Sequence, residues 1–305
     1  MATTESSVRP LQGAQTDPTR KSDSLTANRF WSQLALYTLA IVTAILFSLP
    51  FFWTVSSSLK TAAEIRQIPP TFWPEEIRWA NYADVFRLAP FGRFIWNTVV
   101  ITGLAMIGQI LSAAAVAFGF TRFRFPGREP LFFLVLSTMM LPWQVTIVPQ
   151  FLLFRYLGWL NTFLPLIVPS FFGGGAFFIF LLRQFFMTIP RDLDEAAKLD
   201  GASSVRIFWS IILPLSGPAI ATVAIFSFLQ HWNEFIGPLI FLNTEDKYTL
   251  SIGLRYFMAN PFESDEPREA ILMAASLIVA LPPLILFFVA QKYFVRGIVT
   301  TGLKG

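Results

Sequence analysis

Few of the residue types that catalyse reactions or bind metals occur in this sequence. Cysteine is absent and His231 is the only histidine, which excludes disulfides, thiol nucleophiles and the usual zinc sites. No GxxxxGK[ST] phosphate-binding loop is present, so any ATP must be hydrolysed by another chain. We therefore expect no catalytic residue, no metal site and no cofactor on this chain.

Charged residues gather at the start of the segment RDLDEAAKLDGASSVRIFWSIILPLSGPAI, which begins at Arg191. Asp194 and Glu195 suit the positive N-terminal end of a short helix, and Pro190 suits its first turn. Gly201 can adopt the left-handed conformation that ends such a helix. The pattern predicts one short helix followed by a tight turn.

A second short helix is predicted directly after this turn. Ser203 or Ser204 can cap its N-terminus, and Pro214 ends it. Four apolar residues fall at i, i+3, i+4 and i+7 and form a single face: Val205, Phe208, Trp209 and Ile212. A helix pair with acidic and aromatic faces suits docking to another protein, but an amphipathic connector on the membrane surface has the same periodicity.

A few polar residues lie in or beside otherwise apolar runs. The four candidates for a transport path are Asn97, Gln144, Asn233 and Glu234. Glu234 is the main candidate because a carboxylate inside a membrane usually faces water or the bundle interior. Interhelical hydrogen bonding is the alternative for all four, and His231 is expected to pack rather than to bind a ligand.

The elements that position these residues are predicted to be membrane-spanning helices. The chain is 54% hydrophobic and 14% charged, with a mean hydropathy of +0.56, whereas soluble domains carry about 25% charged residues. Six runs lack Asp, Glu, Lys and Arg and are long enough to cross the hydrocarbon, which takes about 20 residues: Leu34–Val55, Phe94–Thr121, Pro130–Phe154, Tyr156–Leu182, Ile207–Gln230 and Ala270–Gln291. The fold class is therefore all-α and polytopic.

Three regions follow from this pattern. Residues 1–32 are polar and are predicted to be a disordered tail, residues 33–295 form the transmembrane domain, and residues 296–305 form a short C-terminal tail. The sizeable loop at 186–214 holds the charged segment. Proline and glycine interrupt most runs, and Gly173–Gly175 marks either a helix break or close packing.

The distribution of Lys and Arg predicts the orientation. With six spans both termini lie on one side, and that side holds the larger share of the 23 Lys and Arg residues. The short connector TRFRFPGRE is strongly basic. The positive-inside rule then places both termini and the loop at 186–214 in the cytoplasm.

One part of the charged loop resembles a known family. Glu195, Ala196 and Ala197, followed by Gly201 and by Leu213-Pro214, resemble the EAA signature of permease subunits in binding-protein-dependent ABC importers. The resemblance implies that this loop docks on a cytosolic ATPase and couples nucleotide-driven motion to the spans. The residues it assigns to coupling are Asp194, Glu195, Ala196, Ala197, Asp200, Gly201, Phe208, Leu213 and Pro214.

The resemblance extends from about Ser58 to Gly305. Over this range the sequence is similar to carbohydrate-uptake permeases, in particular the second, shorter permease of the maltose type. It rests on SLKTAAEI, NYADVF, WNTVVIT, LPWQVTIVPQFLLFRYLGWLNT, WNEFIGPLIFL and QKYFVRGIVTTGLKG. It implies the type I importer fold in a prokaryotic plasma membrane. The implied partners are a second permease, two ATPase subunits, an external solute-binding protein and membrane lipid, with no nucleic acid.

Other function classes remain as alternatives. A permease of the same class for a non-sugar solute fits equally well, because the EAA signature does not define the cargo. A secondary transporter would need more intramembrane carboxylates or repeated halves, and only Glu234 lies in a span. A membrane enzyme would need a nucleophile or metal motif, and neither GxSxG nor HExxH is present.

Overall fold

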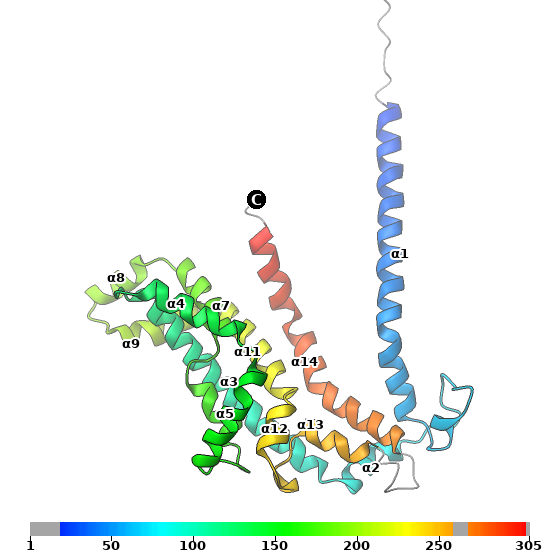
Figure 1. Cartoon of the computed structure of the whole chain (residues 1–305). Helices are drawn as coiled ribbons and strands as arrows, with labels where there is room; N and C mark the ends of the chain where they lie inside the picture. Colours follow the sequence, from blue (N-terminus) through cyan, green and yellow to red (C-terminus); the bar gives the residue numbers. More distant parts are fainter. Residues whose placement is uncertain (1–18, 259–267, 303–305) are drawn as a thin grey trace, which may run out of the picture. The chain divides into compact units, whose positions relative to one another are not determined.

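The computed structural model describes the backbone of residues 19–258 and 268–302 and the side chains of residues 31–258 and 268–291. Within these ranges the chain forms helices and turns and no β-strand, which confirms the all-α prediction (Figure 1). The α-helices are α1 Thr19–Ser58, α2 Ala80–Leu88, α3 Phe91–Arg122, α4 Arg128–Ser137, α5 Trp143–Tyr156, α6 Leu164–Ile167, α7 Ala176–Thr188, α8 Asp192–Leu199, α9 Ser204–Ile207, α10 Leu213–Leu215, α11 Gly217–Trp232, α12 Ile236–Phe241, α13 Leu250–Gly253 and α14 Glu269–Gly302. Short 3₁₀ turns occur at η1 Glu64–Arg66, η2 Thr138–Met140, η3 Val168–Phe171, η5 Glu245–Lys247 and η6 Leu254–Phe257, and a π-helical turn at η4 Phe208–Ile212.

The chain divides into two compact units, residues 1–53 and residues 54–305. The first unit holds most of α1, whose apolar part Trp31–Ser58 is long enough to span a membrane. Helix α1 begins at Thr19, so it extends into the region 1–32 that we predicted to be disordered. Extending a formed helix costs little per residue, which explains that correction, and residues 1–18 lie outside the described part.

Four single helical segments are long and apolar enough to cross a membrane: Trp31–Ser58, Phe91–Arg122, Leu164–Thr188 and Glu269–Gln291. Two further helix pairs are bent and form either a broken span or a re-entrant loop each, Arg128–Met140 with Trp143–Tyr156 at 96° and Ser204–Leu215 with Gly217–Trp232 at 81°. Counting each bent pair once gives six spans, which agrees with the six predicted runs.

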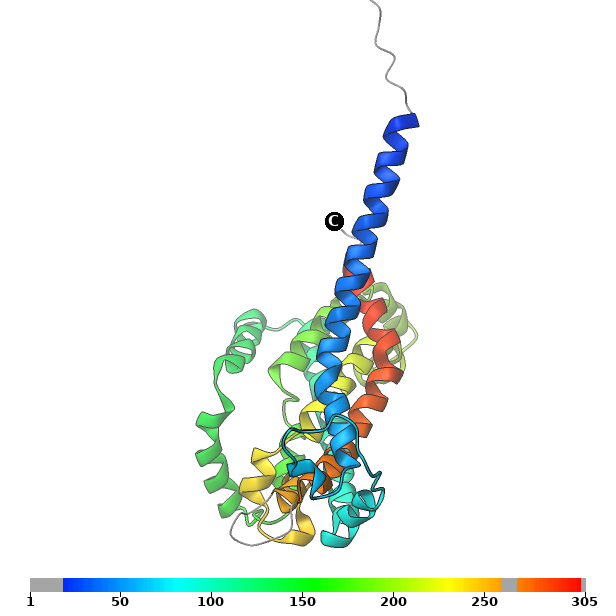
Figure 2. The same cartoon turned by 90° about the vertical axis from the view of Figure 1, so that its right-hand side faces the viewer.

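The boundaries of three predicted spans need correction. The third run bends before Pro142, and Figure 2 shows its two halves, α4 and α5, in green at the left. The fourth span begins at Leu164 rather than Tyr156, because Gly158 and Asn161 adopt positive φ angles of 69° and 57° and turn the chain. The fifth bends between Leu215 and Gly217, so the long α11 starts ten residues after Ile207.

Helix α3 is the centre of the second unit. It has 32 residues and is therefore about 48 Å long, which exceeds the hydrocarbon thickness of about 30 Å. Small residues on its inner side, Ala113, Ala114 and Ala117, are fully buried against α7 and α11 in a cluster that includes Leu182 and Val223. Such residues let helix backbones approach closely.

The three glycines before α7 form a break in the fourth span. Gly173, Gly174 and Gly175 have φ angles of 95°, 59° and 85°, which L-residues rarely adopt. Gly174 also lies directly on α3, since a Cβ there would come within 2.5 Å of the Ala113 backbone nitrogen. The break and the close packing are thus both present at this position.

Gly174→Ala should destabilise the unit by at least about 2 kcal/mol, because it adds left-handed strain and an overlap with the α3 backbone. Thermal unfolding of the detergent-solubilised protein measures the loss. Gly103→Ala is the matched control, because nothing lies within 4 Å of a Cβ at Gly103. Equal unfolding temperatures for the two variants would contradict the close packing.

Candidate coupling loop and transport path

The loop after α7 has the predicted arrangement of two short helices around a turn. Helix α8 carries three acidic residues in its first turn, and Ser203 caps α9 by accepting a hydrogen bond from the Arg206 backbone N–H at 3.3 Å. Figure 1 shows α8 and α9 together at one end of the second unit, near the C-terminal end of α3. The charged segment is therefore an ordered structure attached to the core.

Gly201 closes α8 with a Schellman motif. Its φ is 81°, and its N–H donates to the Lys198 carbonyl at 3.0 Å. The Ala202 N–H donates to the Ala197 carbonyl at 2.8 Å. No atom lies within 4 Å of a Cβ built at Gly201, so the requirement for glycine comes from the backbone conformation and not from packing inside the chain.

Asp194 holds the loop to the end of α3. Its Oδ2 lies 2.9 Å from Arg122 Nε, and the two side chains are only 9% and 5% exposed. Arg122 also donates to the Ile189 carbonyl at 3.2 Å, and Arg191 donates to the Thr121 carbonyl at 3.1 Å. Asp194 therefore faces the core of its own chain, and Arg122 is a partner that sequence reasoning did not identify.

Phe208 provides the apolar anchor of the loop. It is 8% exposed, and its ring centroid lies 5.2 Å from that of Phe118 on α3. Of the four residues predicted to form one apolar face, Val205, Phe208 and Trp209 line a single pocket beside α3. Ile212 departs from them, because it is fully buried. The π-helical turn η4 holds more residues per turn and so shifts the side chains after Ile207 around the helix.

The other predicted coupling residues lie at or near the surface of the loop. Leu199 next to them is 90% exposed. The exposed ones are Glu195, Ala196, Asp200, Gly201 and Pro214, and the half-buried ones are Ala197 and Leu213. The loop thus presents an acidic and apolar surface on a base that is buried.

A polar cluster connects α3 and α11 inside the bundle. The Gln109 side-chain oxygen accepts a hydrogen bond from Ser227 and lies 3.1 Å from His231 Nε2. Ser227 is fully buried. His231 therefore packs as expected, whereas its partner Gln109, 122 residues earlier, carries no sequence signal that pairs the two.

Glu234 lies in the short break between α11 and α12. Its Oε1 accepts a hydrogen bond from the Gly237 N–H at 2.9 Å, at the N-terminus of α12. It is half-buried and borders a small cavity of about 20 Å³ together with Thr98, His231 and Thr249. The carboxylate thus sits among polar groups, and its role in the transport path stays a prediction.

The three amide candidates have different surroundings. Asn97 on α3 is 5% exposed and donates to the carbonyls of Asp246 and Tyr248 at 2.9 and 3.0 Å. Asn233 is exposed and donates to the Leu229 carbonyl. Gln144 is exposed near the start of α5. Within the described residues no side-chain hydrogen bond joins these amides to one another or to Glu234.

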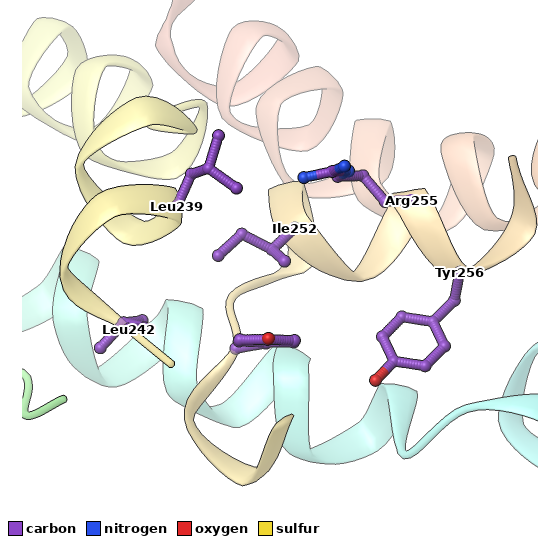
Figure 3. Close-up of a pocket in the computed structure, with 6 residues that line it drawn as sticks. Leu239, Leu242, Ile252, Arg255 and Tyr256 are labelled. Carbon is purple, nitrogen blue, oxygen red and sulfur yellow. The ribbon is translucent and has the colours of Figure 1, made fainter. Parts of the chain in front are cut away.

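An open pocket of about 400 Å³ lies at the other end of α3 from the coupling loop (Figure 3). It is lined by Leu239, Leu242, Tyr248, Ile252, Arg255 and Tyr256. In Figure 3 the guanidinium of Arg255 extends across the space above Ile252 towards Leu239. Burial and a hydrogen bond to Glu245 raise the pKa of Tyr256 to about 12, so this tyrosine stays neutral.

The pocket is built on a platform of side chains from α3. Phe94 on α3 lies between two tyrosine rings of the pocket, with centroid distances of 6.3 Å to Tyr248 and 5.8 Å to Tyr256. Thr98 Oγ1 accepts a hydrogen bond from the Leu250 N–H at 2.8 Å. Gly253 lies so close to Phe94 that a Cβ would come within 2.4 Å of the ring. Sequence reasoning did not identify this pocket, whose residues join only in the fold.

Residues 109–300 match the family of binding-protein-dependent transport system inner membrane components. The chain belongs to this family. The match includes the whole coupling loop, and it establishes the chain as the membrane-spanning permease of such a transport system and as a multi-pass protein of the plasma membrane. The family match also excludes the two other function classes considered from the sequence, a secondary transporter and a membrane enzyme.

Individual relatives cover nearly the whole chain. The osmoprotective compounds uptake permease protein GgtD of Synechocystis is 34% identical over 93% of this chain and 97% of the relative. The diacetylchitobiose uptake system permease protein NgcG of Streptomyces coelicolor is 33% identical over 87% of each chain. A solved bacterial ABC transporter involved in the import of the acidic polysaccharide alginate superposes with a TM-score of 0.77 at 25% identity, covering 88% of this chain and 98% of that one. The type I importer permease fold is thereby confirmed.

Asp194→Asn should lower the free energy of unfolding by on the order of 3 to 5 kcal/mol, because it leaves the Arg122 charge buried without its partner. Thermal unfolding and co-purification of the ATPase subunit are the measurements. Asp192→Asn, an exposed change in the same helical turn, is the control. The double variant Arg122→Gln with Asp194→Asn should recover part of the lost stability. Equal losses of stability for Asp192→Asn and Asp194→Asn would show that the Arg122–Asp194 ion pair does not hold the loop to α3.

Proposed function

We propose that this chain forms half of the translocation pathway of an ATP-driven importer for a sugar or a related solute. The relatives named for diacetylchitobiose and alginate transport handle carbohydrates, which supports this solute class. The osmoprotective compounds of a further relative keep a non-sugar solute as the second candidate. The expected partners are a second permease, two cytosolic ATPase subunits and an external solute-binding protein.

The coupling loop carries the proposal. Its Glu195 and Gly201 surface is exposed, while its base is held to α3 by the Arg122–Asp194 ion pair and by Phe208. A force applied to the exposed surface therefore acts on α3 directly, because the loop cannot move freely at its base. We infer that the ATPase binds this surface and moves α3 with it.

The open pocket at the opposite end of α3 suits an entry region for solute. Arg255 offers hydrogen-bond donors, and tyrosine rings present the flat apolar faces on which sugar rings pack. A volume of about 400 Å³ is within the range of about 300 to 1,000 Å³ for small-molecule sites. Helix α3 would then connect solute entry with ATPase docking.

The proposed orientation places both termini and the coupling loop in the cytoplasm. The basic connector after α3 lies beside Arg191 and the coupling loop, so the basic segments gather at the same end of the unit. This agrees with the positive-inside rule. The backbone of α14 continues through Gly302 into the predicted tail 296–305; the side chains there lie outside the described part, and contact of this tail with the ATPase stays a prediction.

Gly201→Val should abolish transport-coupled ATP hydrolysis while leaving membrane insertion intact. A branched side chain at a φ of 81° is strained by about 1 to 2 kcal/mol and reshapes the docking turn. The measurement is binding-protein-stimulated ATP hydrolysis by the reconstituted complex.

Gly201→Asn is the matched control for this experiment, because asparagine tolerates the left-handed conformation. It should retain most of the activity and most of the ATPase association. Normal hydrolysis by Gly201→Val would contradict the docking assignment, whereas loss of insertion would show a folding defect rather than uncoupling.

Glu234→Cys tests the transport path. The sequence has no native cysteine, so a charged thiol reagent has no background target. We expect labelling in at least one nucleotide state, because a carboxylate in a span usually faces water. Ser227→Cys, at a fully buried position, should stay unlabelled; if Glu234→Cys is also unlabelled in every state, Glu234 serves only as a helix contact.

A further inference from the structure

A second open pocket, of about 470 Å³, lies where α3 ends and α4 begins. It is lined by Arg124, Phe125, Gly127, Arg128, Glu129, Pro130 and Arg191. Arg191 directly precedes α8, so the pocket adjoins the base of the coupling loop. None of these residues other than Glu129 carries negative charge, and the function described above does not use the pocket.

The charges in this pocket do not balance. Glu129 lies 2.7 Å from Arg128 and 3.1 Å from Arg183 on α7, so two guanidinium groups share one carboxylate. Arg191 donates a hydrogen bond to the Thr121 carbonyl and makes no ion pair among the residues that the structure describes. Arg124 is exposed and makes no ion pair within the described residues. The lining therefore has three guanidinium groups against one carboxylate, which favours an anion.

The surroundings of the pocket favour a lipid over a free anion. Helix α4 starts at the pocket and exposes Leu131, Phe133 and Leu134 by 52%, 73% and 63%. Phe125 of the lining is also 41% exposed. A basic pocket that continues into an apolar helix surface has the two chemistries of a phospholipid, a charged headgroup and acyl chains.

We propose that this pocket binds the phosphate headgroup of an anionic phospholipid, with the acyl chains along α4. Arg124 and Arg191 hold the phosphate, and Arg128 borders it while it stays paired with Glu129. The leaflet follows from the proposed orientation and is the cytoplasmic one. Because Arg191 also holds the end of α3, a bound phosphate stabilises the base of the coupling loop and makes coupling sensitive to anionic lipid.

The test uses the complete transporter, with its partner subunits, purified in detergent. Native mass spectrometry measures the affinity for added phosphatidylglycerol. Arg124→Gln should weaken binding about fivefold, the effect expected for one basic residue at a lipid surface, and Arg124→Lys should retain most of the affinity. Arg155→Gln, which changes an exposed arginine at the end of α5, is the matched control and should bind like the unchanged protein.

Two further measurements separate the alternatives. Inorganic phosphate should not displace phosphatidylglycerol, and ATP hydrolysis in phosphatidylcholine vesicles should rise when phosphatidylglycerol is added, less so for Arg124→Gln. Equal lipid binding by Arg124→Gln and the unchanged protein overturns the proposal, as does displacement by phosphate alone. Loss of ATPase association by Arg124→Gln in pure phosphatidylcholine also overturns it, because the pocket would then be a protein contact. Failure of Gly201→Val to uncouple hydrolysis would affect the docking assignment and not this lipid site.

Discussion

The ion pair between Arg122 and Asp194 is the contact on which the coupling geometry depends. Removing two charges from water costs several kcal/mol per ion, and a buried pair returns this cost only with good geometry. Arg122 Nε and Asp194 Oδ2 lie 2.9 Å apart, and this buried contact positions α8 on the end of α3, although Asp194 Oδ1 has no hydrogen-bond partner within the described residues.

This fixed attachment gives α3 its role in the unit. The helix carries Phe94, Asn97 and Thr98 near one end, where they hold the platform of the open pocket. Near the other end it carries Phe118 and Arg122, which hold the coupling loop. A single helix thus contacts both regions, and alanines in its C-terminal half let α7 and α11 pack closely against it.

Sequence reasoning recovered the spans and the coupling loop because both depend on local patterns. The length of a charge-free run is enough to predict a span, and Gly201 predicts the turn because glycine can adopt the left-handed conformation. The direction of Asp194 could not be predicted, since adjacent residues on a helix point about 100° apart and only the distant Arg122 selects which one faces inward. The π-helical turn at Phe208 was missed for the same reason, because tertiary packing selects it. The bends at Pro142 and just after Pro214 instead follow from proline, which the sequence does show.

Polar side chains of this permease lie where the membrane spans are broken. A helix end inside a membrane exposes backbone N–H groups that lipid cannot satisfy, so each break needs polar partners from its own chain. Glu234 supplies one by accepting from the Gly237 N–H, and Ser112 supplies another by accepting from the Gly173 N–H at 2.7 Å. A polar side chain at a break thus bonds a free backbone N–H group of the helix end. It can also take part in transport only if it reaches water. Glu234 meets the first condition and borders a cavity, which separates it from Asn97, whose amide nitrogen donates to two backbone carbonyls of the platform.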